Sequence, residues 1–160
     1  MTSTLSISTR EPTVILASGA QVAVQVHLGE PTVAHLDAME RQLRALRAKH
    51  PGGLGLLFVV GEGSSAPSGP ARARGVEMFG RLRDSVKIVS AAILGTGFRA
   101  SAKRSVFTMF ASTVFGTARV KVFGDLDEAG AWLTVECAKA AIACPPKLDL
   151  LTEVRALMKP

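Results

Sequence analysis

An unbroken apolar run, Leu54–Val60, constrains this chain more than any other stretch of its sequence. The run has the length of a β-strand, and Gly52, Gly53 and Gly61 flank it. A strand of this kind is buried on both faces, which occurs mainly in parallel sheets that helices cover on both sides. The sequence therefore predicts an α/β fold with this run as a central parallel strand.

The rest of the sequence alternates strand-like and helix-like segments. β-rich runs at 13–17 and 22–28, separated by the turn residues Ser18-Gly19-Ala20, predict a hairpin. Two further strands are expected at 87–94 and 119–123, and helices are expected to begin near residues 32, 70, 97 and 126. This order predicts an N-terminal β-hairpin followed by alternating helices and strands, with a mixed, mostly parallel central sheet.

The helix expected after Gly97 carries an apolar stripe at helical spacing. Its members, widened by Phe110 and Val114, are Ala102, Val106, Met109 and Thr113. Such a stripe normally faces the core of a globular protein. We therefore expect these side chains to be buried.

A length of 160 residues, 48% of them hydrophobic, suits one domain, which we expect over residues 12–143. The Ser/Thr-rich residues 1–11 are expected to be a disordered tail, since they lack the charged start and apolar core of a secretory signal. Residues 144–160 predict a short C-terminal helix or tail that docks on the domain or meets a partner. No apolar stretch is long enough to span a membrane, so we expect a cytoplasmic protein.

Composition also bears on partners. The formal net charge of +6 permits contact with phosphates, acidic proteins or an anionic membrane, although a solvated basic face explains the same charge without a ligand. One tryptophan and no tyrosine disfavour a stacking platform, so no specific nucleic-acid partner is expected. Cys137 and Cys144 lie seven residues apart, which suits neither a disulfide framework nor a zinc site and predicts reduced thiols.

The phrase VKVFGDLDEAGAWL, at residues 120–133, joins a strand to a helix that Asp125 and Glu128 are placed to cap. Together with the element order over about residues 12–135, this phrase resembles the SpoIIAA-like, STAS/SEC14-type bacterial domains. These domains are related in fold to anti-sigma-factor antagonists. The resemblance implies a STAS-like sandwich and a non-catalytic regulatory or protein-interaction role.

The resemblance also implies a place for regulation. In anti-sigma-factor antagonists a serine at the start of the second helix is phosphorylated, and this switches partner binding. The matching loop here is 61–69, so Ser64 and Ser65 are the phosphorylation candidates, and Arg72, Arg74 and Met78 are candidates for the partner surface. The family's Asp-Ser-Gly or Asp-Ser-Ser-Gly pattern is absent, and helix capping also explains these serines.

A second candidate site opens the helix after residue 97. Backbone N–H groups at a helix start attract anions, and cations there call for an anionic neighbour. The candidate residues for an anion or ligand are Gly95, Gly97, Arg99, Lys103 and Arg104. A phosphorylated small molecule, an acidic protein or a lipid headgroup would suit them, whereas a dinucleotide would not, because Arg119 stands near the position of the acidic residue that binds ribose.

No catalytic constellation can be assembled from the sequence. His27, His35 and His50 are scattered, and no acid or nucleophile stands at motif spacing beside them. We expect no enzyme activity, no metal site and no cofactor.

Two alternatives stay open. The SEC14-type side of the resemblance suggests a small-molecule or lipid-binding module, whose chain would lie among Val106, Phe107, Phe110 and Phe115. A carrier needs an enclosed apolar pocket, whereas an interaction module needs a filled core and an exposed patch. A homodimer through the terminal helix or an edge strand is also left open.

Overall fold

The computed structural model describes residues 3–116 and 118–160. In chain order the elements are β1 (Ser6–Arg10), β2 (Val14–Gly19), β3 (Val22–His27), α1 (Val33–Lys49), β4 (Leu54–Val60), α2 (Gly69–Leu82), β5 (Val86–Ile93), α3 (Gly97–Val114), β6 (Arg119–Phe123), α4 (Leu126–Lys139) and α5 (Lys147–Leu157). The hairpin, the alternation that follows it and the bounds of β4 and β6 agree with the sequence prediction.

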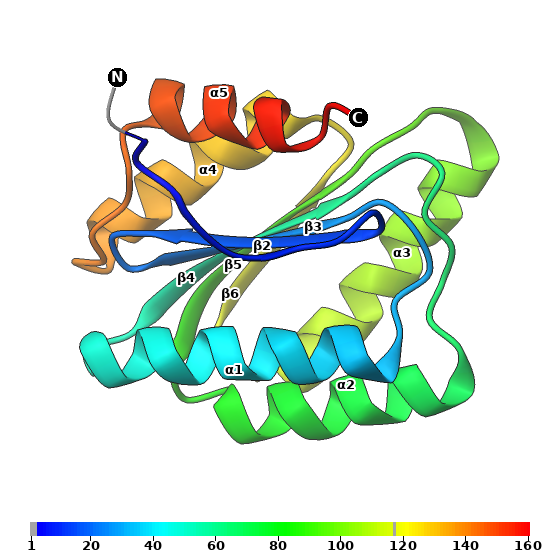
Figure 1. The fold of residues 1–160 in the computed structure, drawn as a ribbon, viewed down its shortest axis with the longest axis horizontal. Coiled ribbons are helices and arrows are strands. Elements are labelled where there is room, and N and C mark those ends of the chain that lie inside the picture. The colour runs from blue at the N-terminus through cyan, green and yellow to red at the C-terminus, as the bar shows by residue number, and fades with distance from the viewer. Residues whose placement is uncertain (1–2, 117) are drawn as a thin grey trace.

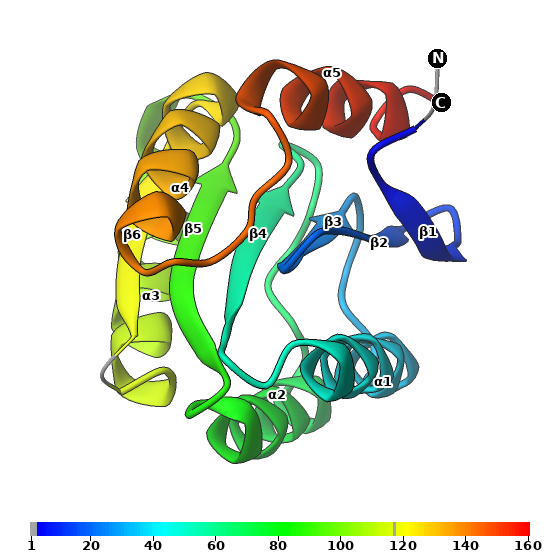
Figure 2. The ribbon, with the colours of Figure 1, turned by 90° about the vertical axis from the view of Figure 1, so that its left-hand side faces the viewer.

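The strands form one sheet in chain order, from β1 at one edge to β6 at the other (Figure 2). The pairs β1–β2 and β2–β3 are antiparallel, and the pairs from β3 to β6 are parallel. Parallel connections are right-handed, so successive strands added in one direction place α1, α2 and α3 on the same face. Figure 1 shows these three helices on one side of the sheet and α4 and α5 on the other. The predicted mixed, mostly parallel sheet is confirmed.

The sheet has one hydrophobic cluster on each face, and strand β4 contributes side chains to both, as its uninterrupted apolar sequence predicts. Leu54 and Leu56 pack in the cluster that α1, α2 and α3 cover, whereas Leu57 and Val59 pack in the cluster beneath α4 and α5. All four side chains are fully buried. A Cβ at Gly55 would lie only 2.9 Å from Cys137 Sγ, so glycine lets α4 approach the strand closely.

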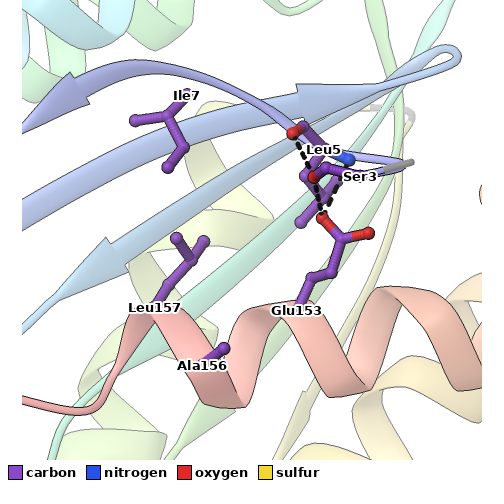
Figure 3. A pocket seen from close by; sticks show the side chains of 6 residues that line it. All are labelled: Ser3, Leu5, Ile7, Glu153, Ala156 and Leu157. Atoms are coloured by element: carbon purple, nitrogen blue, oxygen red, sulfur yellow. Dashed lines mark hydrogen bonds between the residues drawn. The ribbon is translucent and has the colours of Figure 1, made fainter. Parts of the chain in front are cut away.

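The N-terminal segment differs from the predicted disordered tail. Ser6–Arg10 forms the edge strand β1, and Leu5 is buried. The Glu153 carboxylate on α5 accepts hydrogen bonds from Ser3 Oγ at 2.5 Å and Leu5 N at 3.0 Å (Figure 3). It also accepts from Thr4 N and Thr4 Oγ1 at 2.6 Å each. Because the partner lies about 150 residues further along the chain, local sequence carries no sign of this attachment.

Helix α5 docks on the domain through its apolar side. Leu150, Leu151, Val154 and Leu157 are buried in the cluster shared with α4 and the sheet. A Cβ at Gly130 of α4 would lie 2.6 Å from Leu151 Cδ2, so the two helices approach closely at this glycine. The sequence left open whether this segment docks on the domain or meets a partner, and in the structure it docks on the domain.

Helix α3 presents the opposite face to the core from the one we expected. Its buried residues are Ala100, Ala111 and Val114, and the half-buried Phe107 and Phe110 pack beside them. Four members of the predicted core stripe, Ala102, Val106, Met109 and Thr113, are exposed instead, with Val106 64% and Met109 72% exposed. The two that widen it, Phe110 and Val114, do pack on the core. The helix has two apolar stripes, and the one that carries the two phenylalanines fits against the sheet because it buries more apolar area.

The attachment of the N-terminal segment can be tested by substituting Glu153 with Gln. Burial alone would raise the pKa of Glu153, but the hydrogen bonds from Ser3, Thr4 and Leu5 hold that pKa at about 2. We expect E153Q to lower the free energy of unfolding at pH 7 by about 1–3 kcal/mol, because the amide forfeits charge-assisted hydrogen bonds. Urea denaturation followed by circular dichroism measures this loss.

The matched control is D127N, because Asp127 is an exposed carboxylate paired with Arg155 and such pairs contribute little. The contribution of Glu153 is present above pH 4.5, its ordinary pKa, and disappears as the pH falls towards 2. Equal urea midpoints for E153Q and the natural chain would contradict this role, as would an equal loss in D127N.

Candidate functional site

The carboxyl ends of β4 and β5 meet the starts of α2 and α3 where the parallel strands end (Figure 1). We call this end of the strands the carboxyl edge of the sheet, as distinct from the edge strands β1 and β6. In open α/β sheets ligands bind outside the carboxyl ends of the strands, which makes this the first place to look for a site. The connections 61–68 and 94–96 lie there, and with them all of the predicted serine and anion-binding candidates. We refer to residues 61–68 as the β4–α2 loop.

Two polar side chains, Ser64 and Lys103, fix the β4–α2 loop through hydrogen bonds to backbone carbonyls. Ser64 Oγ donates to the carbonyl of Gly29 at 2.8 Å, and Ser64 is only 2% exposed. Lys103 Nζ donates to the carbonyl of Ser64 at 2.5 Å and to that of Glu62 at 3.3 Å. Ser65, the next residue, is exposed. Of the two predicted phosphorylation candidates, only Ser65 therefore presents its side chain to a modifying enzyme.

The predicted anion-binding set is divided by the fold. Arg104 donates to the carbonyls of Ile93 and Gly95 at 3.3 Å each, so this cation fastens the β5–α3 connection just as Lys103 fastens the β4–α2 loop. Arg99 is exposed. Gly95 and Gly97 have φ values of +117° and +85°, which L side chains rarely adopt, so both glycines are explained by backbone geometry. Arg99 is the cation of this set that stays accessible.

The helix starts at this edge differ from those of α1 and α4. Thr32 and Asp125 cap their helices with side-chain oxygens, whereas Ser68 before α2 and Thr96 before α3 make no side-chain cap bond. Neither α2 nor α3 has an acidic residue in its first turn. Neither helix start is therefore capped by a side chain of its own helix, and the start of α2 favours anionic groups, whereas the Glu62 carboxylate already lies beside Gly95 before α3.

The predicted partner surface is mostly structural. Arg72 is exposed, as a contact residue must be. Met78 is fully buried, so it contributes packing beneath α2 and no accessible surface. Arg74 Nε donates to Asp37 Oδ1 at 2.9 Å, and its Nη2 donates to Glu40. Its guanidinium is therefore committed to holding α2 against α1.

Glu40 is the centre of the contact between α1 and α2. Its nearly buried carboxylate accepts hydrogen bonds from Arg74, from Arg44 at 2.8 Å and from Arg81 at 3.1 Å. The hydrogen bond from Arg74 does most to lower the pKa of Glu40, which lies at about 2 although burial opposes the shift. Two arginines of α2, Arg74 and Arg81, are thus paired with carboxylates of α1 within the domain.

His27 is buried at the carboxyl end of β3. Its ring stacks on Phe58 with 4.6 Å between centroids, and neither ring nitrogen has a hydrogen-bond partner among the described residues. Burial, with a smaller contribution from His35, lowers the pKa of His27 to about 4. The sequence signal for its burial was position: β3 lies next to the central strand, where both faces are covered.

The phenylalanines suggested for a lipid chain pack on one another and on the sheet. Phe107 lies 5.2 Å from Phe58, and Phe115 lies 4.9 Å from Phe79, between ring centroids. Phe115 is 1% exposed. This cluster fills the space between α2, α3 and the sheet, so these rings serve as core.

Two surface depressions lie away from this edge. One, of about 220 Å³, is lined by Ser3, Leu5, Ile7, Glu153, Ala156 and Leu157 (Figure 3). The other, of about 350 Å³, is lined by Arg44, Arg47, Ala48 and Pro51. Both are open to solvent. Neither includes a predicted site residue.

Two further searches concern metal ions and membranes. Within residues 3–116 and 118–160, no three His, Cys, Asp or Glu side chains are grouped so that they could hold a metal ion. Across the same described part of the chain, none of the helices combines the length and apolar character needed to cross a bilayer.

Comparison with known proteins supports the fold. No family model and no curated protein matches the sequence. Among solved structures, an uncharacterized protein from the DUF3478 family with a SpoIIAA-like fold, from Shewanella loihica PV-4, is similar. The TM-score is 0.55 at 16% sequence identity, over 81% of this chain and 91% of that chain. A likeness at this identity shows the fold alone, and it confirms the SpoIIAA-like fold that the sequence suggested.

The buried histidine predicts a dependence of stability on pH. The native state keeps His27 neutral down to about pH 4, whereas the unfolded chain takes up a proton below about pH 6.5. Stability therefore falls as the pH is lowered, by about 2 kcal/mol between pH 7 and pH 5. We expect H27F, which keeps the stacking on Phe58, to remove this loss in urea denaturation at the two pH values.

The partly exposed His50 provides the matched control, since H50Q should leave the loss between pH 7 and pH 5 unchanged. Retention of the full pH dependence in H27F would show that the buried ring is not its source.

Proposed function

We propose that this protein is a non-catalytic regulatory module that binds an acidic protein partner through the β4–α2 loop and the first turns of α2. The observation that carries the proposal is the anchoring of this loop by Ser64 and Lys103. A loop fastened in one conformation presents the exposed Ser65, next to the exposed Arg72 in the first turn of α2, at little cost in ordering entropy on binding.

The character of this edge supports a protein partner of negative charge. The uncapped starts of α2 and α3 and the exposed Arg72 and Arg99 give it positive polarity. Small-molecule sites are concave and mostly apolar, whereas the depressions described above are open and lie elsewhere. The resemblance to anti-sigma-factor antagonists adds a precedent, because those proteins meet their partners at the corresponding loop and helix.

Ser65 is the position at which this binding would be regulated. A phosphate on Ser65 would add up to two negative charges three residues before Ser68, the N-cap of α2. The added charge would neutralise the positive surface and repel an acidic partner. Ser64 is excluded from this role by its burial and by its bond to Gly29.

The experiment is quantitative affinity purification of the full chain from the cells that express it, with R72E compared against R47E. Both arginines are exposed, but Arg47 lies in the last turn of α1, at the opposite edge of the parallel strands. We expect R72E and S65E to reduce recovery of the specific partner at least tenfold, with R47E unchanged.

Two results would overturn the proposal. One is that every co-purifying protein is recovered equally with R72E and R47E. The other is a stoichiometric lipid or metabolite bound to the purified chain, detected by native mass spectrometry, since a ligand carrier would then fit better than an interaction module.

A further inference from the structure

Helix α3 carries an exposed apolar stripe that no other described segment of the chain covers. Phe98 is 88% exposed, Val106 64% and Met109 72%. Ala102 and Thr113, on the same side of the helix, are exposed as well. Since successive members of this set are three or four residues apart, they form one seam along the helix. We call these five residues the α3 seam.

The α3 seam is distinct from the face that docks α3 on the domain. Ala100, Ala111 and Val114 are buried on the other side, together with the half-buried Phe107 and Phe110. The seam therefore belongs to a helix whose place in the domain is already secured. Exposure of a large aromatic and two aliphatic side chains along one line of a soluble protein is typical of an association surface.

We propose that the α3 seam binds the α3 seam of a second copy of this chain, with the two helices antiparallel. This pairing sets residues whose numbers sum to about 211 opposite one another. Phe98 then faces the smaller Thr113, the small Ala102 faces the large Met109, and Val106 lies near the two-fold axis. Large side chains meet small ones along the whole seam, as knobs-into-holes packing requires.

The charges of α3 favour the same arrangement. All three cations of the helix, Arg99, Lys103 and Arg104, lie in its first half, and its last turn carries no basic residue. In an antiparallel pair, Arg99 comes close to the negative end of the other copy's helix, which stabilises a cation. In a parallel pair, Arg99 of one chain would instead lie opposite Arg99 of the other chain, and the two positive charges would repel each other. The seam itself contains no charged residue, so no charge is buried by the contact.

An anionic membrane is a poorer occupant of the seam. Helices that lie on membranes carry several free lysines or arginines beside their apolar face. On α3, Lys103 and Arg104 are bound to backbone carbonyls, which leaves Arg99 as the accessible cation of this helix. The seam is therefore better matched by its own apolar copy than by a charged lipid surface.

The size of the contact predicts a dimer that depends on concentration. A helix of 18 residues is about 27 Å long, and one pair of such helices buries less than the roughly 1,200–2,000 Å² of standard interfaces. We therefore expect a monomer–dimer equilibrium rather than a permanent dimer. The seam residues lie outside the β4–α2 loop and α2, so the R72E test of the proposed function and the test of this dimer can fail separately, although Arg99 contributes to both surfaces.

The test is sedimentation velocity of the full chain over a wide range of concentration. We expect the natural chain to dimerise and V106D to raise the dissociation constant at least tenfold, because two carboxylates would meet near the axis. V135D is the matched control, since Val135 is 52% exposed on α4, on the opposite face of the sheet. Circular dichroism should find V106D folded, because position 106 is on the surface.

A charge-swap experiment identifies the occupant. Since residue 106 faces its own copy, V106D and V106K should each be monomeric, and an equal mixture of the two should recover the dimer. A natural chain that stays monomeric at all concentrations would overturn the proposal. So would a V106D chain that dimerises like the natural one, a mixture that stays monomeric, or seam-dependent binding to anionic vesicles in place of dimerisation.

Discussion

Burial of β4 on both faces is the constraint on which the rest of this structure depends. Seven consecutive residues without a charge have no solvated side, so helices must cover the sheet above and below. The right-handed connections β3–α1–β4, β4–α2–β5 and β5–α3–β6 fill one side, which leaves the other to α4 and α5. Gly55 completes the arrangement, because a larger residue would push Cys137 and α4 away from the strand.

The same topology creates the candidate site. Parallel strands end at a common edge, so the β4–α2 loop and the β5–α3 connection become neighbours although about thirty residues separate them in the sequence. Lys103 and Arg104 then bind backbone carbonyls of these connections, and Ser64 binds the carbonyl of Gly29 between β3 and α1. The polar residues predicted for phosphorylation or for anion binding are thus divided into those that build the edge and those, Ser65 and Arg99, that remain available at it.

Two carboxylates join segments that are far apart in the sequence of this basic chain. Glu40 gathers Arg44, Arg74 and Arg81 between α1 and α2, and Glu153 binds the segment that precedes β1. Each carboxylate keeps its charge because several donors compensate for lost hydration. One consequence is that the count of 19 lysines and arginines overstates the cations open to a partner, since arginines of α2 and α3 are already bound within the domain.

Features that depend on neighbours in sequence were determined by the sequence itself. The apolar run of β4 set the fold class, and the spacing of Asp125 and Glu128 set the start of α4, where the Glu128 N–H donates to Asp125 Oδ1 at 2.9 Å. Tertiary structure alone decided which stripe of α3 is buried, that Met78 lies beneath α2, that His27 is enclosed, and that Glu153 holds residues 3–5. The physical reason is that periodicity reveals which residues share a face, whereas burial and hydrogen bonding depend on what the folded chain brings against that face from far along the sequence.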